Sequence, residues 1–270
     1  MFWEETRPLK KLPLGIKLGL TAFLLIAGIG YLLGFTNIYL SYSPNDQNPG
    51  LSVADVRLAF YGSREGTKLE TAIQGPMRQY FASDSDFEKV RQWIREGGKE
   101  SSFVNVQPVF AASCDSCHSN ASRVGGVVTE DYAGLSPLLA QDSGIPVSRL
   151  VQISHTHVLA ALPLIFLLCF VFSFSRFPQV VKGVVIVFSL LAIPADIGSW
   201  WLAKLSAAAA PLVILGGVCL GLAFGALVLL TLYDIWLRKV IRLQAVEILR
   251  QSSRNSPTAE KNALIASIEK

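Results

Sequence analysis

The chain has 270 residues, half of them apolar, with a mean hydropathy of +0.43 and a formal net charge of +4. Its apolar residues form long uncharged stretches, and the remaining polar sequence is too short to cover them as a soluble core. The composition therefore excludes an ordinary soluble globular protein and predicts a membrane protein whose spanning elements are helices.

The first apolar stretch predicts a transmembrane helix near residues 15–37. No charged residue occurs between Leu18 and Asn45, a length that exceeds the roughly 20 residues needed to cross the hydrocarbon core. The apolar part is long and no small-x-small cleavage site follows it cleanly. We therefore expect a retained anchor helix rather than a cleaved signal peptide.

Residues 38–148 predict a small helical domain between the first and second membrane helices. Ser52 is suited to cap the first of its helices. A later helix carries four apolar side chains on one face, at Phe87, Val90, Trp93 and Ile94. The expected helical segments are 53–61, 68–81 with a break at Gly75-Pro76, and Asp84 or Ser85 to Gly97-Gly98, after which residues 101–113 lead into the next motif.

The segment Cys114-Asp115-Ser116-Cys117-His118 is the most informative part of the sequence. CxxCH is the attachment signature of a c-type haem, in which two thiols add across the haem vinyl groups and the adjacent imidazole binds the iron. The alternatives are a redox CxxC pair and half of a zinc site. Zinc would need two further ligands, and the remaining histidines, His155 and His157, lie at a predicted membrane surface.

Residues Val104 to Gly126 resemble the haem-binding stretch of c-type cytochromes: a short apolar helix, the motif, and a Gly-rich turn. The resemblance covers less than a tenth of the chain and is specific for haem attachment. It implies one covalent haem c held by Cys114 and Cys117, iron ligation by His118, electron transfer, and export to the oxidising side of a bacterial membrane. Gly125-Gly126 either lets the backbone pass close to the haem edge or forms a surface turn.

The second axial ligand departs from the pattern of small soluble cytochromes c, which use a methionine well after the motif. Here both methionines, Met1 and Met77, precede it. Imidazole is the natural replacement, and Ser154-His155-Thr156-His157 begins the second predicted membrane helix. Two residues apart on a helix, the rings point about 200° apart, so one of them at most faces a given haem.

We favour His157 as the sixth iron ligand, with His155 and Met77 as alternatives. An open sixth site is a further alternative, in which both histidines are interfacial residues bonded to lipid headgroups or backbone.

Three further apolar stretches predict membrane helices near residues 151–174, 182–203 and 208–233. Pro163 and Pro194 lie inside the second and third helices and are expected to kink them.

The fourth predicted membrane helix carries Gly217, Gly221 and Gly225 on one face, which predicts close packing against another helix. Cys169 and Cys219 are expected to be small apolar packing residues.

Asp196 is the only acid inside the third membrane helix, and it lies four residues before Trp200, at the depth of the two histidines. A buried carboxylate needs a hydrogen-bond partner. If an imidazole N–H is that partner, the carboxylate would fix the tautomer of the ring and raise its basicity. The alternative is an interfacial aspartate that reaches toward headgroups. Trp200 and Trp201 are typical of an aromatic belt.

The distribution of charge predicts the orientation in the membrane. Basic residues predominate in the N-terminal segment, in the loop between helices two and three, and after helix four, whereas residues 36–148 have nine basic and thirteen acidic side chains. The positive-inside rule then places both termini in the cytoplasm and the 38–148 domain in the periplasm. Covalent haem attachment, as the resemblance implies, requires the same side.

The expected fold is all-α: four transmembrane helices with a small helical periplasmic haem c domain inserted between helices 1 and 2. Its divisions are residues 1–37, the N-terminus and anchor helix; 38–148, the haem c domain; 149–237, a three-helix transmembrane part; and 238–270, a basic cytoplasmic tail with a flexible link near 252–259.

We interpret the chain as a membrane-bound monohaem cytochrome c of the bacterial inner membrane, an electron-transfer subunit of a larger respiratory or photosynthetic complex. The sequence shows no nucleophile, second metal site or phosphate loop, which favours a subunit over a free-standing enzyme. Expected partners are other complex subunits, the lipid bilayer, and a quinol or a periplasmic cytochrome, with no nucleic acid.

Two other functions are compatible with the sequence. One is a quinol-oxidising module in which Asp196 and a histidine take the quinol protons. The other is a haem-based redox or gas sensor, or an assembly subunit.

Overall fold

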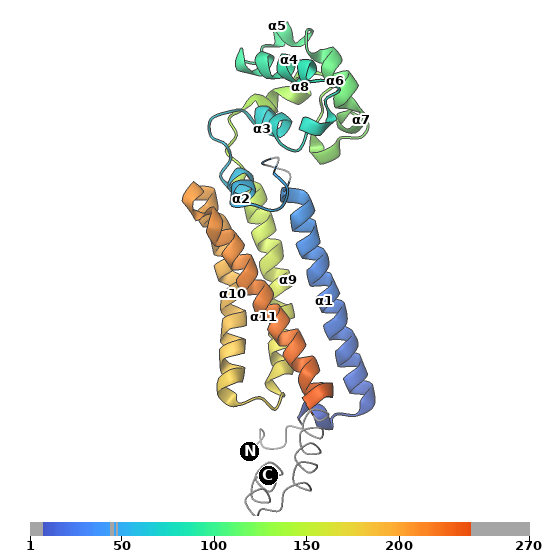
Figure 1. The fold of residues 1–270 in the computed structure, drawn as a ribbon, viewed down its shortest axis with the longest axis vertical. Helices are drawn as coiled ribbons and strands as arrows, with labels where there is room; N and C mark the ends of the chain where they lie inside the picture. The colour runs from blue at the N-terminus through green and yellow to red at the C-terminus, as the bar shows by residue number, and fades with distance from the viewer. Residues whose placement is uncertain (1–7, 44–45, 47, 239–270) are drawn as a thin grey trace, which may run out of the picture. The chain divides into compact units, whose positions relative to one another are not determined.

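Four long helices dominate the computed structural model, which describes residues 8–43, 46 and 48–238 (Figure 1). Within those residues the secondary structure is helical, apart from one isolated bridge between Thr67 and Gln141. The long helices are α1, Leu14–Tyr42; α9, Val147–Ser173; α10, Gln179–Leu205; and α11, Ala210–Leu232. Each belongs to a stretch long and apolar enough to cross a bilayer, so the predicted membrane protein with four candidate spans is confirmed.

The helix α9 begins at Val147, four residues before the predicted span. Pro146 precedes it, and Leu150 in its first turn is completely buried against Val56 and Phe60. This packing extends the helix beyond the apolar stretch, so His155 and His157 lie inside α9 rather than at its start. The helices α9 and α10 continue through Pro163 and Pro194, and the predicted kinks stay predictions.

The chain divides into two compact units. The first contains, within the described residues, 8–32, 159–193 and 220–238, with a core of fully buried apolar side chains from α1, α9 and α11: Leu24, Leu168, Phe172 and Leu227. It also contains η1, Leu9–Lys11, and a π-helical turn, η6, Tyr233–Leu237. The second unit consists of residues 33–158 and 194–219, which include all the short helices between α1 and α9.

The short helices follow the local signals in the sequence. Ser52 caps α2 as predicted, because its hydroxyl accepts from the Asp55 N–H at 3.0 Å while its own N–H donates to the Asp55 carboxylate at 2.8 Å. The elements are α2, Val53–Phe60; α3, Lys68–Gln74; η2, Arg78–Tyr80; α4, Asp84–Arg95; α5, Glu100–Phe103; α6, Gln107–Ser113; α7, Asp115–His118; η3, Val124–Gly126; α8, Tyr132–Leu135; and η4, Ser136–Leu139.

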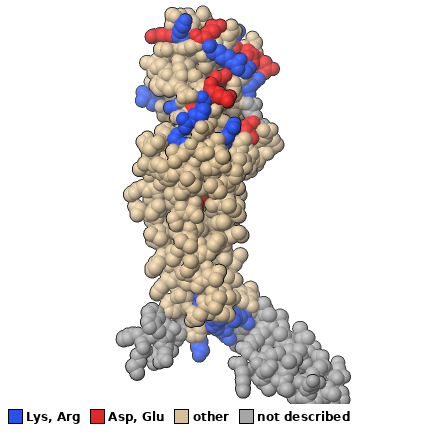
Figure 2. Space-filling view, turned by 90° about the vertical axis from the view of Figure 1, so that its left-hand side faces the viewer, with Lys and Arg blue, Asp and Glu red and all other residues tan. Residues whose placement is uncertain are grey.

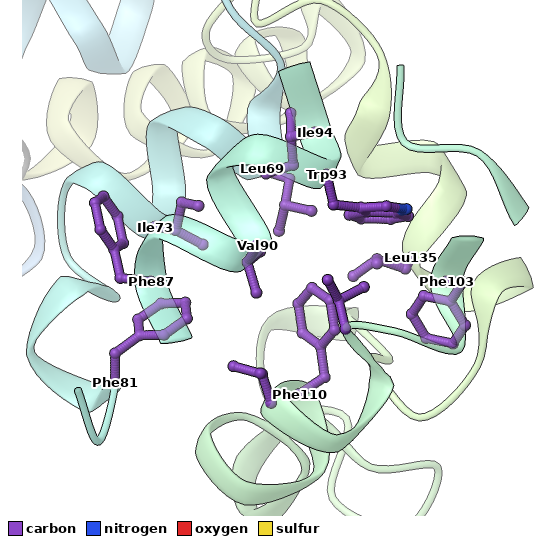
Figure 3. Close-up of a cluster of buried hydrophobic side chains, with 12 residues drawn as sticks. Leu69, Ile73, Phe81, Phe87, Val90, Trp93, Ile94, Phe103, Phe110 and Leu135 are labelled. Carbon is purple, nitrogen blue, oxygen red and sulfur yellow. The ribbon is translucent and has the colours of Figure 1, made fainter. Parts of the chain in front are cut away.

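The apolar face predicted for α4 forms one side of an aromatic core (Figure 3). Phe87, Val90, Trp93 and Ile94 are all buried there. The Trp93 and Phe110 rings meet edge to face with centroids 6.2 Å apart, and Phe103 lies 6.0 Å from Phe110. Because Phe110 belongs to α6, this core holds the helix that leads directly into the CxxCH motif.

Asp142 joins the beginning and the end of the segment between α1 and α9. Its carboxylate accepts hydrogen bonds from the Ser63 N–H, the Thr71 hydroxyl and the Gly144 N–H, each at 2.9 Å. Gly62 and Gly144 both have positive φ, and a Cβ on Gly62 would lie 2.3 Å from the Gly144 nitrogen. The two stretches of chain can therefore approach this closely only because both residues are glycine.

Candidate functional site

The CxxCH segment forms a single helical turn at the end of α6. The N–H of Cys114 donates to the Phe110 carbonyl at 2.8 Å, and the N–H groups of Cys117 and His118 donate to the Cys114 carbonyl at 3.1 and 2.9 Å. Cys114 is half-buried against the aromatic core, whereas Cys117 is exposed. One turn thus presents two thiols and an imidazole, one thiol resting on the core and the other open to solvent.

The imidazole of His118 is oriented by a backbone carbonyl. Its Nδ1 lies 3.0 Å from the Val124 oxygen. Because a carbonyl can only accept, Nδ1 carries a proton, and in the neutral ring Nε2 then holds the lone pair. A neutral imidazole with one nitrogen fixed by a hydrogen bond and the other unprotonated is the form that binds metals. Sequence reasoning missed this contact, since a backbone acceptor leaves no signature in residue types.

Thr129 closes the loop that follows the motif. Its N–H donates to the His118 carbonyl at 2.9 Å and its hydroxyl to the Asp115 carboxylate at 2.7 Å. Inside this loop, Gly125 and Gly126 have φ of +66° and +74°, and a Cβ on either would meet no atom within 4 Å. The turn conformation therefore accounts for both glycines in the protein itself.

Burial raises the pKa of the Cys114 thiol to about 11, and the charges of Asp115 and Cys117 act in the same direction. The attacking cysteine of a redox CxxC pair has a lowered pKa instead, because the thiolate is its reactive form. This environment thus disfavours Cys114 as the attacking thiol of a redox pair.

His157 and Asp196 lie beside the same tryptophan in the second unit. The Nδ1 of His157 lies 2.8 Å from the Ile153 carbonyl, and its ring meets Trp200 edge to face at 5.0 Å. Asp196 lies on α10 four residues before Trp200 and is only 7% exposed. The predicted pairing of a histidine N–H with Asp196 stays a prediction, whereas the burial of Asp196 speaks against an aspartate that reaches toward headgroups.

The remaining candidate ligands lie in different surroundings. His155 is exposed on α9, as His157 is, and Met77 is half-buried before η2. Among the described residues, no hydrogen bond or ring contact joins His118 to either of them or to His157, and no group of three or more His, Cys, Asp or Glu side chains could hold a metal ion. The identity of the sixth ligand stays a prediction.

Glycines of α11 make two close helix contacts. A Cβ on Gly216, which sequence reasoning missed, would lie 2.9 Å from the Asp196 Cα, and one on Gly217 would lie 3.9 Å from its carboxylate. Gly221 approaches the Tyr31 hydroxyl, 2.9 Å from a built Cβ, whereas Gly225 meets nothing within 4 Å. Close packing is confirmed at Gly221 but not along the whole predicted face.

The two other cysteines lie on the long helices, Cys169 on α9 and Cys219 on α11. Cys169 is buried and Cys219 half-buried, as expected for small packing residues. Trp201 makes a specific contact, because its indole N–H donates to the Ser154 hydroxyl at 3.1 Å.

Comparison with known proteins supports the membrane part of the chain. A family model described as a transmembrane helical domain matches residues 128–241, a region that contains α9, α10 and α11 and begins after the CxxCH motif. No curated protein and no solved structure matches the chain.

Proposed function

We propose that the chain is a membrane-bound c-type cytochrome with one haem, which transfers single electrons as a subunit of a larger bacterial membrane complex. The observation that carries the proposal is the hydrogen bond from Nδ1 of His118, the histidine of the CxxCH turn, to the carbonyl of Val124 in the loop that follows. This bond leaves Nε2 able to bind iron in the residue that the motif assigns to that role.

The residues present fit a covalent haem c. Two thiols and an imidazole that donates through Nδ1 lie on one helical turn. Cys114 in that turn packs against the aromatic core. The haem would supply a one-electron iron couple. Cys114 and Cys117 would hold it through thioethers, His118 would bind the iron, and the Val124 carbonyl would keep the imidazole in orientation.

The proposed setting is the periplasmic face of the inner membrane, with both termini in the cytoplasm. The excess of acids in residues 36–148 and of bases in the flanking loops supports this orientation. Electrons would come from a quinol or a partner subunit and go to a periplasmic cytochrome or another subunit.

Covalent haem can be measured directly. The protein, produced in a bacterium with c-type haem maturation, should give a haem-stained band after denaturing electrophoresis and one haem per chain in a pyridine haemochrome assay. The band should disappear in Cys114→Ser/Cys117→Ser and persist in the control Cys169→Ser/Cys219→Ser. A wild-type band without haem stain would refute the proposal.

A second candidate function, quinol oxidation, is favoured by the buried Asp196 beside His157 and Trp200. A quinol that becomes a quinone releases two electrons and two protons; the electrons would leave one at a time through the haem, and Asp196 and a histidine that does not bind the iron would receive the protons. The oxidised protein should then be reduced by decylubiquinol, more slowly in Asp196→Asn but not in the control Glu65→Gln. Absence of quinol-dependent reduction would exclude quinol oxidation but would leave the proposed electron-transfer function unaffected.

A further inference from the structure

An apolar cavity of about 340 Å³ opens in the first unit, where η1, α1 and the end of α9 meet. Its lining is entirely aliphatic or aromatic: Leu9, Leu12, Leu20, Val171 and Phe174. The N–H of Leu9 donates to the Phe174 carbonyl at 3.3 Å, so the two walls are joined. Such a lining offers water no hydrogen bonds and suits a hydrocarbon chain.

Cations gather beside this cavity. On the face drawn in Figure 2, Lys and Arg side chains collect at the lower end of the helices. Residues 8–43, 173–182 and 233–238 contain one acid, Asp234, against six basic residues: Lys10, Lys11, Lys17, Arg176, Lys182 and Arg238. The local charge is therefore strongly positive.

The single acid does not neutralise this cluster. Asp234 is fully buried and is shared by Arg176 and Arg238, each with a guanidinium nitrogen 3.2 Å from the same oxygen. The Lys182 ammonium donates to the carbonyls of Ser173 and Ser175, at 3.1 and 3.4 Å. These carbonyls are neutral, so they accept its hydrogen bonds without neutralising its charge. Two guanidinium groups and a nearby ammonium group face a single carboxylate, so the cluster keeps an excess of positive charge. This excess favours the binding of a further anion.

The cavity and the cations are continuous along the chain. Phe174 lines the cavity, Ser175 follows it, and Arg176 begins the cationic side. Ser175 is only 5% exposed and its hydroxyl has no hydrogen-bond partner within the described residues. A buried hydroxyl without a partner is costly, and this one lies where an apolar wall changes to a charged one.

We infer that this region binds an anionic phospholipid, with one acyl chain in the cavity and the phosphate against Arg176, Lys182 and Arg238. An anionic lipid supplies both the hydrocarbon and the negative charge that the two parts of the site require. Basic pockets between membrane helices bind such headgroups on the cytoplasmic side, where the proposed orientation puts this end. The inference does not rest on the haem, because none of these residues belongs to the second unit.

The test uses the delipidated full-length protein in detergent, titrated with dioleoyl phosphatidylglycerol or dioleoyl phosphatidylcholine and followed by native mass spectrometry. We expect clear preference for phosphatidylglycerol. Lys182→Gln should weaken its binding roughly fivefold, since a lysine near an anionic headgroup contributes through charge. Leu12→Trp, which fills the cavity, should weaken binding to a similar extent.

Matched controls separate the site from general effects. Lys89→Gln removes a charge outside the first unit, and Leu18→Trp enlarges a side chain that is 54% exposed on α1. Both should bind phosphatidylglycerol like the wild type, and all variants should keep the wild-type unfolding temperature.

Three results would overturn the inference. They are equal affinity for the two lipids, site variants that bind like the controls, and displacement by inorganic phosphate together with an unaffected Leu12→Trp variant, which would indicate an ion site without a lipid chain.

Discussion

A histidine that binds iron must keep one ring nitrogen unprotonated, and in His118 the backbone of the following loop decides which one. The acceptor is the Val124 carbonyl, whose position depends on a turn closed by the bond from the Gly126 N–H to the Arg123 carbonyl at 2.8 Å. His157 has the same arrangement, with Nδ1 on the Ile153 carbonyl. Both rings therefore keep Nε2 available as a ligand atom.

The sixth ligand is predicted to be His157. Low-temperature EPR or near-infrared MCD of the oxidised protein should show bis-histidine ligation, which is lost in His157→Ala and kept in His155→Ala. A His/Met signature that disappears in Met77→Leu would assign the ligand to Met77. Bis-histidine signals unchanged in both histidine variants would contradict the prediction for either residue.

The two motif cysteines should react differently in protein made without haem attachment. Because the pKa of Cys114 is raised to about 11, its thiolate is scarce near neutral pH, and its alkylation should accelerate about tenfold per pH unit up to that value. Cys117 is exposed and should be labelled first. Peptide mass spectrometry after timed iodoacetamide treatment gives both rates, and equal rates at neutral pH would contradict the prediction.

Among the helices, α11 depends on one glycine for its contact with α10. Gly216→Val should destabilise the protein by about 1–3 kcal/mol, because its Cβ would lie 2.9 Å from backbone of α10, which cannot move aside. Gly225→Val is the control, since no atom lies within 4 Å of its Cβ. Thermal unfolding in detergent measures the stability of both variants. Equal shifts in unfolding temperature would show that the close contact between Gly216 and α10 does not determine stability.

Helices with strong local signals could be predicted from the sequence. The capping box at Ser52, the apolar face of α4 and the four long apolar stretches each place an element by local chemistry alone. The start of α9 could not be placed, because Leu150 is fixed by contacts with Val56 and Phe60, which are distant in sequence.

The site shows the same division between local and distant causes. The CxxCH spacing is enough to single out Cys114, Cys117 and His118 as a candidate haem-attachment site, because the chemistry of attachment fixes that order. The Val124 acceptor depends on a loop conformation, and the choice of Gly216 over Gly225 depends on how α11 is rotated toward its neighbour. Neither property is encoded in residue types at fixed spacing.

For the molecule as a whole, orientation in the membrane is the property that the proposed function requires. An impermeant maleimide added to intact spheroplasts should label Ser101→Cys, in the segment between α1 and α9. It should not label Ser252→Cys, in the C-terminal tail, until the membrane is opened. Labelling of both positions from one side would contradict the proposed topology.

The isolated bridge between Thr67 and Gln141 has an evolutionary consequence. The Lys68 N–H donates to the Ala140 carbonyl at 3.0 Å and the Asp142 N–H to the Gly66 carbonyl at 2.9 Å, so the polypeptide leaves and returns at the same place. A stretch whose two ends adjoin can be exchanged as a cassette, because a short turn bridges the gap that it leaves. A membrane scaffold of this kind can thus gain or lose the helical segment between these two ends in one genetic step.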